Sequence, residues 1–195
     1  MPESEREDQQ LYLFGELTDE QTKEVIERLV TQWDRDHVLF INSDGGSSFN
    51  ALALVNAIKL HGRVDTVCLG VALSGAADCL AAGRRRLIVP NAIAMIHQVS
   101  WDIGNEVTAN LLQNARFLER LNRQLTQMLA DDCHQPFDRV SADIATDHYL
   151  FGQEIIDYGM ADNYFDPARL PALQRRRRAP RPVPDEVERH RRERG

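Results

Sequence analysis

The chain has 195 residues, of which 43% are hydrophobic and 27% are charged, and its formal net charge is −7. A domain of this length buries roughly 70% of the surface that its unfolded chain exposes, so one hydrophobic core can stabilise it without disulfides. The acidic balance argues against a nucleic-acid-binding surface on the folded part, because phosphate contacts need clustered lysine or arginine.

The number of cysteines and the composition of the first eight residues indicate in which cellular compartment the protein works. Cys68, Cys79 and Cys133 are odd in number and show no C-x-x-C spacing, which favours reduced thiols. The first eight residues are acidic and contain no apolar segment of a signal peptide. No run approaches the ~18 apolar residues of a membrane-spanning helix. We therefore expect a cytoplasmic protein that is not embedded in a membrane.

The first half of the chain alternates strands and helices. Leu11 to Phe14 is predicted to be a short strand, and Thr18 with Gln21 has the spacing of a capping box that opens a helix. His37 to Ile41 is almost entirely apolar, as expected for a buried strand, and it leads into Asn-Ser-Asp-Gly-Gly, a turn that glycines make easily. Ser47 or Ser48 then caps a helix that runs to Leu60 and stops at Gly62.

The same pattern recurs after Gly62. Val64 to Leu69 is predicted to be a strand, and residues 70–74 connect it to a short alanine-rich helix that ends at Gly83. Leu87 to Val89 and Ala92 to Ile96 supply further strands, which are separated at Pro90 because proline cannot donate to a strand ladder. His97 therefore lies at a strand end, where α/β enzymes hold their reactive groups.

A long amphipathic helix follows, from about residue 106 to residue 130. Leucines and other apolar residues recur there at helical spacing, among them Leu111, Leu112, Leu118, Leu121, Leu125 and Leu129. A helix of this length is about 37 Å long. Its apolar stripe favours packing against another subunit, and the alternative is a helix that covers its own sheet. A helix at Asp138 to Ala145, a strand at Tyr149 to Phe151 and a turn at Glu154 to Tyr158 complete the expected fold.

Three side chains stand out as a possible hydrolase site. Ser74 lies where a strand gives way to a helix, so it is either an ordinary N-cap or a nucleophile exposed at a helix N-terminus. His97 is either a histidine at the rim of the core or a general base, and Asp147 is either a loop carboxylate or the group that orients that base. The backbone N–H groups of Gly46 and Gly75 would form an oxyanion hole.

Motifs for other chemistries are absent from the sequence. The segment Gly70-x4-Gly75 lacks the lysine of a phosphate-binding loop, and neither G-x-G-x-x-G nor G-x-S-x-G occurs. Neither H-E-x-x-H nor paired cysteines occur either. We therefore expect no metal and no cofactor.

These residues occur within linked motifs that resemble the proteolytic subunit of the Clp protease. The motifs are Ile41-Asn-Ser-Asp-Gly-Gly, Gly70-x-Ala-x-Ser74, Ala81-Ala-Gly83, Pro90-Asn91, Met95-Ile-His97-Gln and Asp147-x-Tyr-Leu, with Glu154 and Tyr158-Gly159. The resemblance covers roughly Leu11 to Phe165. It implies an α/β fold of the crotonase-like type, a β/α spiral head with a long handle helix.

The resemblance also implies roles for residues and partners. It assigns the nucleophile to Ser74, the base to His97, the orienting carboxylate to Asp147 and the oxyanion donors to Gly46 and Gly75. It implies a serine endopeptidase that forms stacked heptameric rings, cleaves unfolded polypeptides or peptides inside an enclosed chamber, and receives them from a partner AAA+ unfoldase that uses ATP. No cofactor is implied for the peptidase itself.

The chain departs from the family pattern at three places. Asp44 replaces the usual proline before the glycine pair, and Gly75 replaces the usual methionine after the serine. Only ten residues, five of them charged, precede Leu11, where the family has a longer segment that receives the ATPase. A carboxylate that pointed into the oxyanion hole would oppose the developing negative charge.

The predicted organisation is an acidic segment over residues 1–10, a peptidase domain over 11–168 with its handle helix at about 105–131, and an arginine- and proline-rich tail over 169–195. That tail contains ten arginines and four acidic residues, and its composition is typical of disorder.

Two other functions remain open from the sequence. One is a catalytically weak or inactive structural or regulatory ring subunit that assembles with a second Clp-like paralogue. The other is an acyl-CoA enzyme of the wider crotonase fold, which would also use two backbone N–H donors but would not need Ser74 or His97.

Overall fold

The computed structural model describes residues 9–100 and 108–166. The chain divides into two units, Met1–Phe165 and Asp166–Gly195, and only the first residue of the second unit lies within the described ranges. The predicted arginine-rich tail over 169–195 and nearly all of the predicted acidic segment over 1–10 therefore lie outside the described residues. The rest of this section concerns the first unit.

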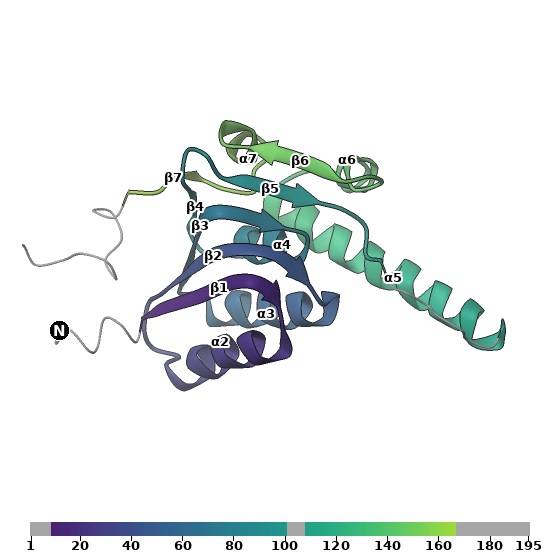
Figure 1. Ribbon diagram of the computed structural model, residues 1–195, viewed down its shortest axis with the longest axis horizontal. Helices are drawn as coiled ribbons and strands as arrows, with labels where there is room; N and C mark the ends of the chain where they lie inside the picture. Colours follow the sequence, from purple (N-terminus) through teal and green to yellow (C-terminus); the bar gives the residue numbers. More distant parts are fainter. Residues whose placement is uncertain (1–8, 101–107, 167–195) are drawn as a thin grey trace, which may run out of the picture. The chain divides into compact units, whose positions relative to one another are not determined.

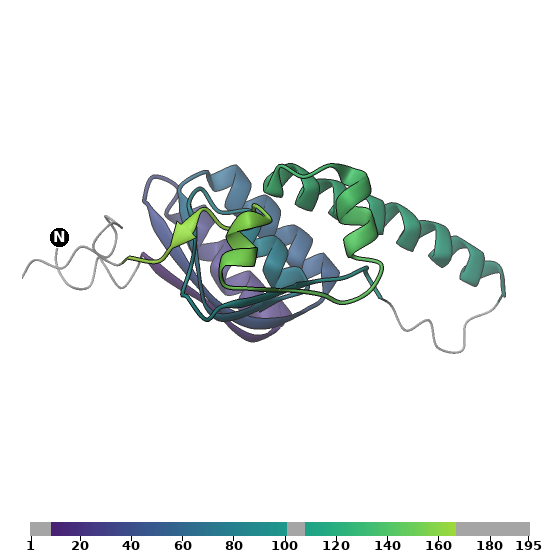
Figure 2. The ribbon, with the colours of Figure 1, turned by 90° about the horizontal axis from the view of Figure 1, so that it is seen from above.

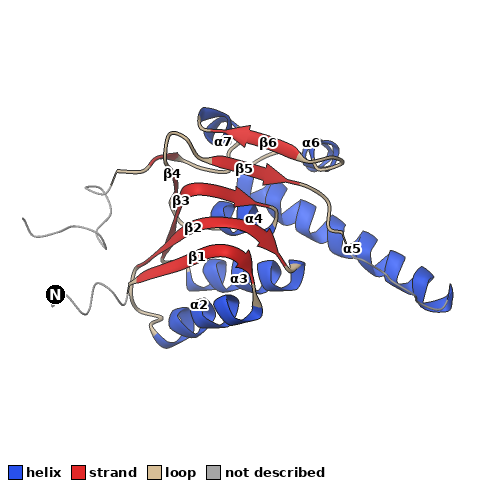
Figure 3. Ribbon diagram, in the orientation of Figure 1, coloured by secondary structure: helices blue, strands red, loops and turns tan. Residues whose placement is uncertain are grey.

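A seven-stranded sheet forms the centre of the described part (Figure 3). Strands β1, β2, β3, β4 and β7 lie side by side in that order and are parallel, while β5 pairs with β3 in parallel and with β6 in antiparallel fashion. The strands span Gln10–Leu17 (β1), His37–Gly46 (β2), Val64–Leu73 (β3), Arg86–Ile88 (β4), Ile93–Ile96 (β5), His148–Phe151 (β6) and Asn163–Tyr164 (β7).

Helices α2, α3 and α4 cover one face of this sheet (Figure 2). The helices span Asp19–Thr31 (α2), Ser48–His61 (α3), Gly75–Ala81 (α4), Thr108–Cys133 (α5), Phe137–Asp143 (α6) and Gln153–Asp157 (α7). Buried leucines and isoleucines of β1, β2 and α3 meet between the two layers, and alternate residues of β1 point the other way, so that Tyr12 and Phe14 are exposed. The α/β fold predicted from the sequence is confirmed.

The predicted helix caps are present. The Gln21 N–H donates to the Thr18 hydroxyl, the Asn50 N–H donates to the Ser47 hydroxyl, and Gly62 ends α3 in a left-handed conformation. The reciprocal half of the capping box differs, because the Gln21 side chain bonds to the backbone of Phe14 on the preceding strand instead of returning to Thr18. This bond ties the end of β1 to the start of α2.

One prediction about the strands was wrong, and one strand was not predicted. Residues 70–73 do not form a connecting turn, because Val71 to Leu73 continue β3 and pair with Ile93 to Met95 of β5. The two-residue strand β7 pairs with β4 and was not predicted. Both differences have the same cause, since pairing with a strand distant in sequence, and not local composition, makes these residues extended.

Helix α5 has two halves with different surroundings. Leu121, Leu129, Ala130 and Cys133 in its second half are buried against the rest of the domain. In the first half Leu111, Leu112 and Phe117 are exposed, and Figure 1 shows this half running beyond the edge of the sheet. The second half of α5 therefore covers its own domain, and packing of the exposed first half against another subunit stays a prediction. The predicted start of the helix, at residues 105 and 106, lies outside the described residues.

Candidate active site

Ser74 occupies the junction between β3 and α4 in an unusual backbone conformation. Its φ is 54° and its ψ is −130°, a positive-φ conformation that L-residues with a side chain rarely adopt. Its side chain makes no capping hydrogen bond to α4. Instead, its Oγ lies 2.7 Å from Nε2 of His97. The ordinary N-cap interpretation of Ser74 is therefore wrong.

Strand register brings Asp147 to the other side of His97. Strands β5 and β6 are antiparallel, with Ile96 opposite His148, so that the next pair outward is His97 and Asp147. Nδ1 of His97 lies 3.4 Å from the Asp147 carboxylate, whose side chain is 58% exposed. The three side chains predicted from the sequence thus form one chain of contacts from Oγ to carboxylate.

The turn at the end of β2 is held by its own polar side chains. The Ser43 hydroxyl donates to the Gly15 carbonyl and accepts from the Gly45 N–H, and Asn42 Oδ1 accepts from the Val71 N–H. A Cβ on Gly45, which has φ +87°, would lie 2.8 Å from the Ser74 Cβ. Only glycine at this position allows the β2 turn to pack against the backbone of Ser74.

Gly46 and Gly75, the predicted oxyanion donors, line the same pocket as Ser74. Gly75 is the first residue of α4, directly after Ser74. Gly46 is the last residue of β2 and pairs with Leu17 of β1. Both glycines therefore border the space into which the Ser74 hydroxyl opens.

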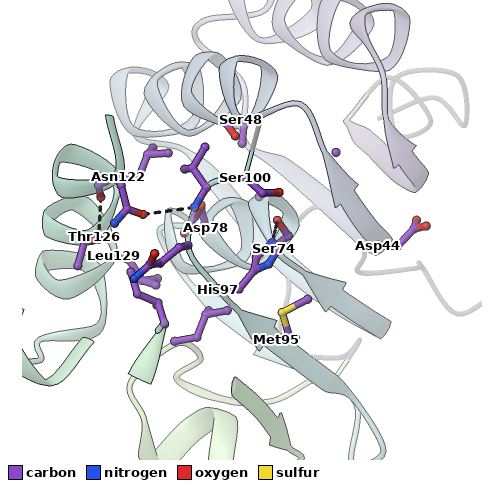
Figure 4. Close-up of a pocket in the computed structure, with 18 residues that line it drawn as sticks. Asp44, Ser48, Ser74, Asp78, Met95, His97, Ser100, Asn122, Thr126 and Leu129 are labelled. Carbon is purple, nitrogen blue, oxygen red and sulfur yellow. Dashed lines mark hydrogen bonds between the residues drawn. The ribbon is translucent and has the colours of Figure 1, made fainter. Parts of the chain in front are cut away.

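This pocket has a volume of about 270 Å³. Figure 4 shows that its walls come from β2, α3, α4, the end of β5 and helix α5. The walls are apolar at Ala51, Met95, Leu125, Leu129 and Ile144, and polar at Ser48, Asp78, Gln98, Ser100, Asn122 and Thr126. A second hollow of about 230 Å³ has Gly46, Ser48, Val99 and Ser100 in common with it. Ser74 and His97 thus face a partly open pocket with room for part of a chain molecule.

The sequence also matches a known protein family. The model of the Clp protease family matches residues 5–167, which is most of the chain. The chain belongs to the Clp protease family. Its fold, a mainly parallel sheet with helices on one face and a long helix α5, is the Clp-type fold that the sequence motifs predicted.

The glycine that replaces the usual Clp methionine after the serine has a packing reason. A Cβ on Gly75 would lie 2.6 Å from the Cβ of Ala51 on α3, closer than two such atoms can approach. Helix α3 therefore approaches the start of α4 so closely that it leaves no room for a side chain. The absence of a side chain at Gly75 and the small side chain of Ala51 together allow this close approach of the two helices.

This close approach predicts that Gly75→Ala lowers the free energy of unfolding by about 1–3 kcal/mol, because a methyl group must fit into filled space. Ala51→Gly alone should lower it by about 1 kcal/mol, the usual difference between glycine and alanine inside a helix. The double variant should lose less than the sum of the two, since it removes the contact. Urea unfolding of the four proteins measures this coupling, and strictly additive losses would contradict it.

Asp44, the second departure from the Clp pattern, lies at the rim of the pocket and is exposed. Figure 4 shows its carboxylate directed away from Ser74. A carboxylate would oppose the oxyanion only if it pointed into the pocket. The Asp44 carboxylate points outward, so it does not oppose the oxyanion in this structure.

The cysteines do not compete with Ser74 as nucleophiles. All three are free and buried. Burial raises the pKa of Cys68 to about 11 and that of Cys133 to about 12, and it raises the pKa of Cys79 as well. These thiols are protonated at neutral pH, and only a thiolate is a strong nucleophile.

The arginine run of this Clp family member has structural partners. Arg84 and Arg85 both donate to the carboxylate of Asp65, which is almost fully buried. Arg86 donates to Asp162 and to the carbonyls of Asp132 and Gly159. The run therefore joins the edge of β3 to the segment after α7, and it does not form a free basic patch.

Sequence analysis missed one charged residue of the pocket. Asp78 lies on α4, four residues after Ser74, and its carboxyl group lines the pocket. Burial and, to a smaller extent, the nearby Asp132 raise the pKa of Asp78 to about 7, although Lys59 acts in the opposite direction. The signal in the sequence was a single acidic residue in the otherwise apolar run Gly75-Ala-Ala-Asp78-Cys-Leu-Ala81.

Within residues 9–100 and 108–166, no three histidine, cysteine or acidic side chains are grouped as metal ligands would be. No helix in these ranges combines the length and the apolar character needed to cross a bilayer.

Proposed function

We propose that this member of the Clp family is a serine endopeptidase subunit that hydrolyses peptide bonds of unfolded proteins or peptides through an acyl-enzyme. The observation that carries the proposal is the 2.7 Å contact between Ser74 Oγ and His97 Nε2, made by a serine in a positive-φ conformation that serves no helix cap. Strained backbone of this kind concentrates at reactive positions.

In the proposed reaction, Ser74 Oγ attacks the carbonyl carbon of the scissile bond while His97 Nε2 takes its proton. His97 then gives that proton to the leaving amine, and the acyl group stays on Ser74 until water, activated by the same nitrogen, hydrolyses the ester. Asp147 accepts a hydrogen bond from Nδ1–H of His97, which fixes the tautomer with a free Nε2 and stabilises the imidazolium.

The proposed oxyanion hole consists of the N–H groups of Gly46 and Gly75. Charge develops on the substrate oxygen in the tetrahedral intermediate, and donors fixed in advance stabilise it without reorganisation. Losing one such donor typically lowers the rate about 10²- to 10³-fold. The support in this chain is that both glycines border the pocket at Ser74.

Reaction with a fluorophosphonate probe tests the proposal, because the probe forms a stable bond only with an activated serine. The wild type should be labelled at Ser74 and should cleave unstructured peptides, and Ser74→Ala should do neither. Sedimentation on the same sample gives the state of assembly. A fully assembled wild type that is neither labelled nor active would contradict the peptidase proposal.

We also propose that the exposed half of α5 is the handle that joins two heptameric rings. Support comes from the exposed leucines Leu111 and Leu112, since apolar side chains on a projecting helix are typical of subunit contacts. A partner AAA+ unfoldase that uses ATP to deliver polypeptides is proposed on the family resemblance alone.

Leu112→Glu should break this assembly, because Leu112 is 64% exposed in the single chain and a charge there would be buried without a partner at the contact. We expect sedimentation to shift from a large assembly to smaller species, with the fold intact by circular dichroism. Leu60→Glu is the matched control, since Leu60 is an exposed leucine on α3, away from the handle. Equal sedimentation of Leu112→Glu and wild type would return α5 to the role of a helix that covers only its own sheet.

One observation supports the alternative, a ring subunit with weak or no activity that assembles with a Clp-like paralogue. The contact between His97 Nδ1 and Asp147 is 3.4 Å long and largely exposed, which is longer than a strong charge-assisted hydrogen bond. Under this alternative, labelling of Ser74 would be absent from the homogeneous protein and would appear only after the paralogue is added.

A further inference from the structure

Asp78 is a charged group without an established task, at the inner wall of the pocket beside Ser74. Helix α4 starts directly after Ser74, and Asp78 lies one turn along it, a rise of about 5.4 Å. Figure 4 shows its side chain between the Ser74–His97 pair and the side chains of helix α5. A substrate side chain that entered the pocket from the scissile bond would therefore meet this carboxyl group.

The surroundings of Asp78 leave its carboxylate without a partner. No hydrogen bond or ion pair joins it to any other residue in the described ranges. The nearest charges are those of Lys59 on α3 and Asp132 on α5, which form an ion pair of 2.7 Å with each other. Lys59 is thus already compensated, and its effect on Asp78 is opposed by that of Asp132.

One part of the pocket wall suits a long aliphatic stem. Leu125 and Leu129 of α5, Ile144 and Ala51 present apolar surface to the space that leads to Asp78. Lysine and arginine bury their methylene stems along apolar surface and direct the charged head to a polar group. The same pocket also has polar walls at Ser48, Asn122 and Thr126. Apolar surface for the stem, together with an unpaired carboxylate and neutral polar groups for the head, fits a cationic side chain better than an aliphatic or aromatic one.

We propose that Asp78 determines the specificity of this site and selects substrates with lysine or arginine at the residue that donates the scissile carbonyl. This inference rests on the proposed peptidase function. A cation beside the Asp78 carboxylate provides the missing partner, whereas an apolar side chain would displace water from this half-buried acid without offering it a hydrogen bond.

The raised pKa of Asp78 and the proposed specificity for a cationic side chain have the same physical cause. The burial that makes Asp78 difficult to ionise also makes a bound cation more favourable, since the attraction between opposite charges is stronger away from water. Replacing Asp78 by asparagine removes an unpaired, half-buried acid, so we expect the variant to fold and to melt no lower than the wild type.

The test compares kcat/KM for two fluorogenic peptides that differ only at that residue, lysine in one and leucine in the other. In the assembled wild type we expect the lysine peptide to be preferred about 10²-fold or more. Asp78→Asn should lose most of this preference, and Asp78→Leu should reverse it. Asp78→Glu keeps the charge and should retain the preference for lysine in part.

Fluorophosphonate labelling separates the two proposals, because the probe carries no side chain for the pocket. Labelling at the wild-type rate in Asp78→Asn, together with a lost preference for lysine, supports the specificity role. Asp157→Asn is the matched control for one unit of charge, since Asp157 is exposed on α7, outside the pocket. A labelled wild type that prefers leucine, or an Asp78→Asn variant whose preference is unchanged, would overturn the inference and leave the peptidase function standing.

Discussion

Ser74→Ala is expected to lower peptidase activity about 10⁶-fold, the loss found when a serine protease is deprived of its nucleophile. Alanine removes the oxygen that forms the acyl-enzyme and leaves His97 without the partner that lies 2.7 Å away. The fold should survive, because serine and alanine have similar difficulty with the positive φ at this position. Peptide hydrolysis by the assembled protein, followed by mass spectrometry of a trapped acyl-enzyme, measures the effect.

Ser141→Ala is the matched control for this variant, since Ser141 lies on α6 and does not line the pocket. It should retain the activity and the labelling of the wild type. Residual hydrolysis by Ser74→Ala within tenfold of the wild type would show that another group is the nucleophile. The protonated thiols of the three buried cysteines make them poor candidates for that group.

Asp147→Asn is expected to lower kcat by about 10⁴-fold with little change in KM, as the equivalent change does in a serine protease. The amide can donate a hydrogen bond to Nδ1 of His97, which leaves the proton on Nε2 and so removes the base that Ser74 needs. Because the Asp147 side chain is 58% exposed, the change should hardly affect the free energy of unfolding. Steady-state kinetics and urea unfolding of the same variant measure the two effects.

Asp138→Asn, an exposed acid on α6, is the control for the loss of one charge. A decrease of less than about tenfold for Asp147→Asn would mean that Asp147 does not orient His97. The long contact between the two residues would then be incidental, which would favour the subunit with weak activity over the peptidase.

Local features of the fold could be predicted from the sequence because neighbouring residues determine them. The Thr18 and Ser47 caps, the left-handed stop at Gly62 and the apolar stripe of α5 each depend on residues within one or two turns. Element boundaries at these places agree with the structure to within a few residues. Linked motifs also predicted Ser74, His97 and Asp147 as one site, and the structure brings the three side chains together, although each residue alone had an ordinary structural interpretation.

Tertiary structure decided what the sequence left open. Whether Ser74 caps α4 or bonds to His97 depends on the backbone conformation at the end of β3. The position of Asp147 depends on the antiparallel register of β5 and β6, which lie some fifty residues apart in the chain. Local sequence patterns also could not predict four other features. These are the continuation of β3 through Leu73, the pairing of β7, the outward direction of Asp44 and the position of Asp78 in the pocket wall. Helix caps and periodicity are encoded within a few residues, whereas register, side-chain direction and burial are fixed only when distant segments pack together.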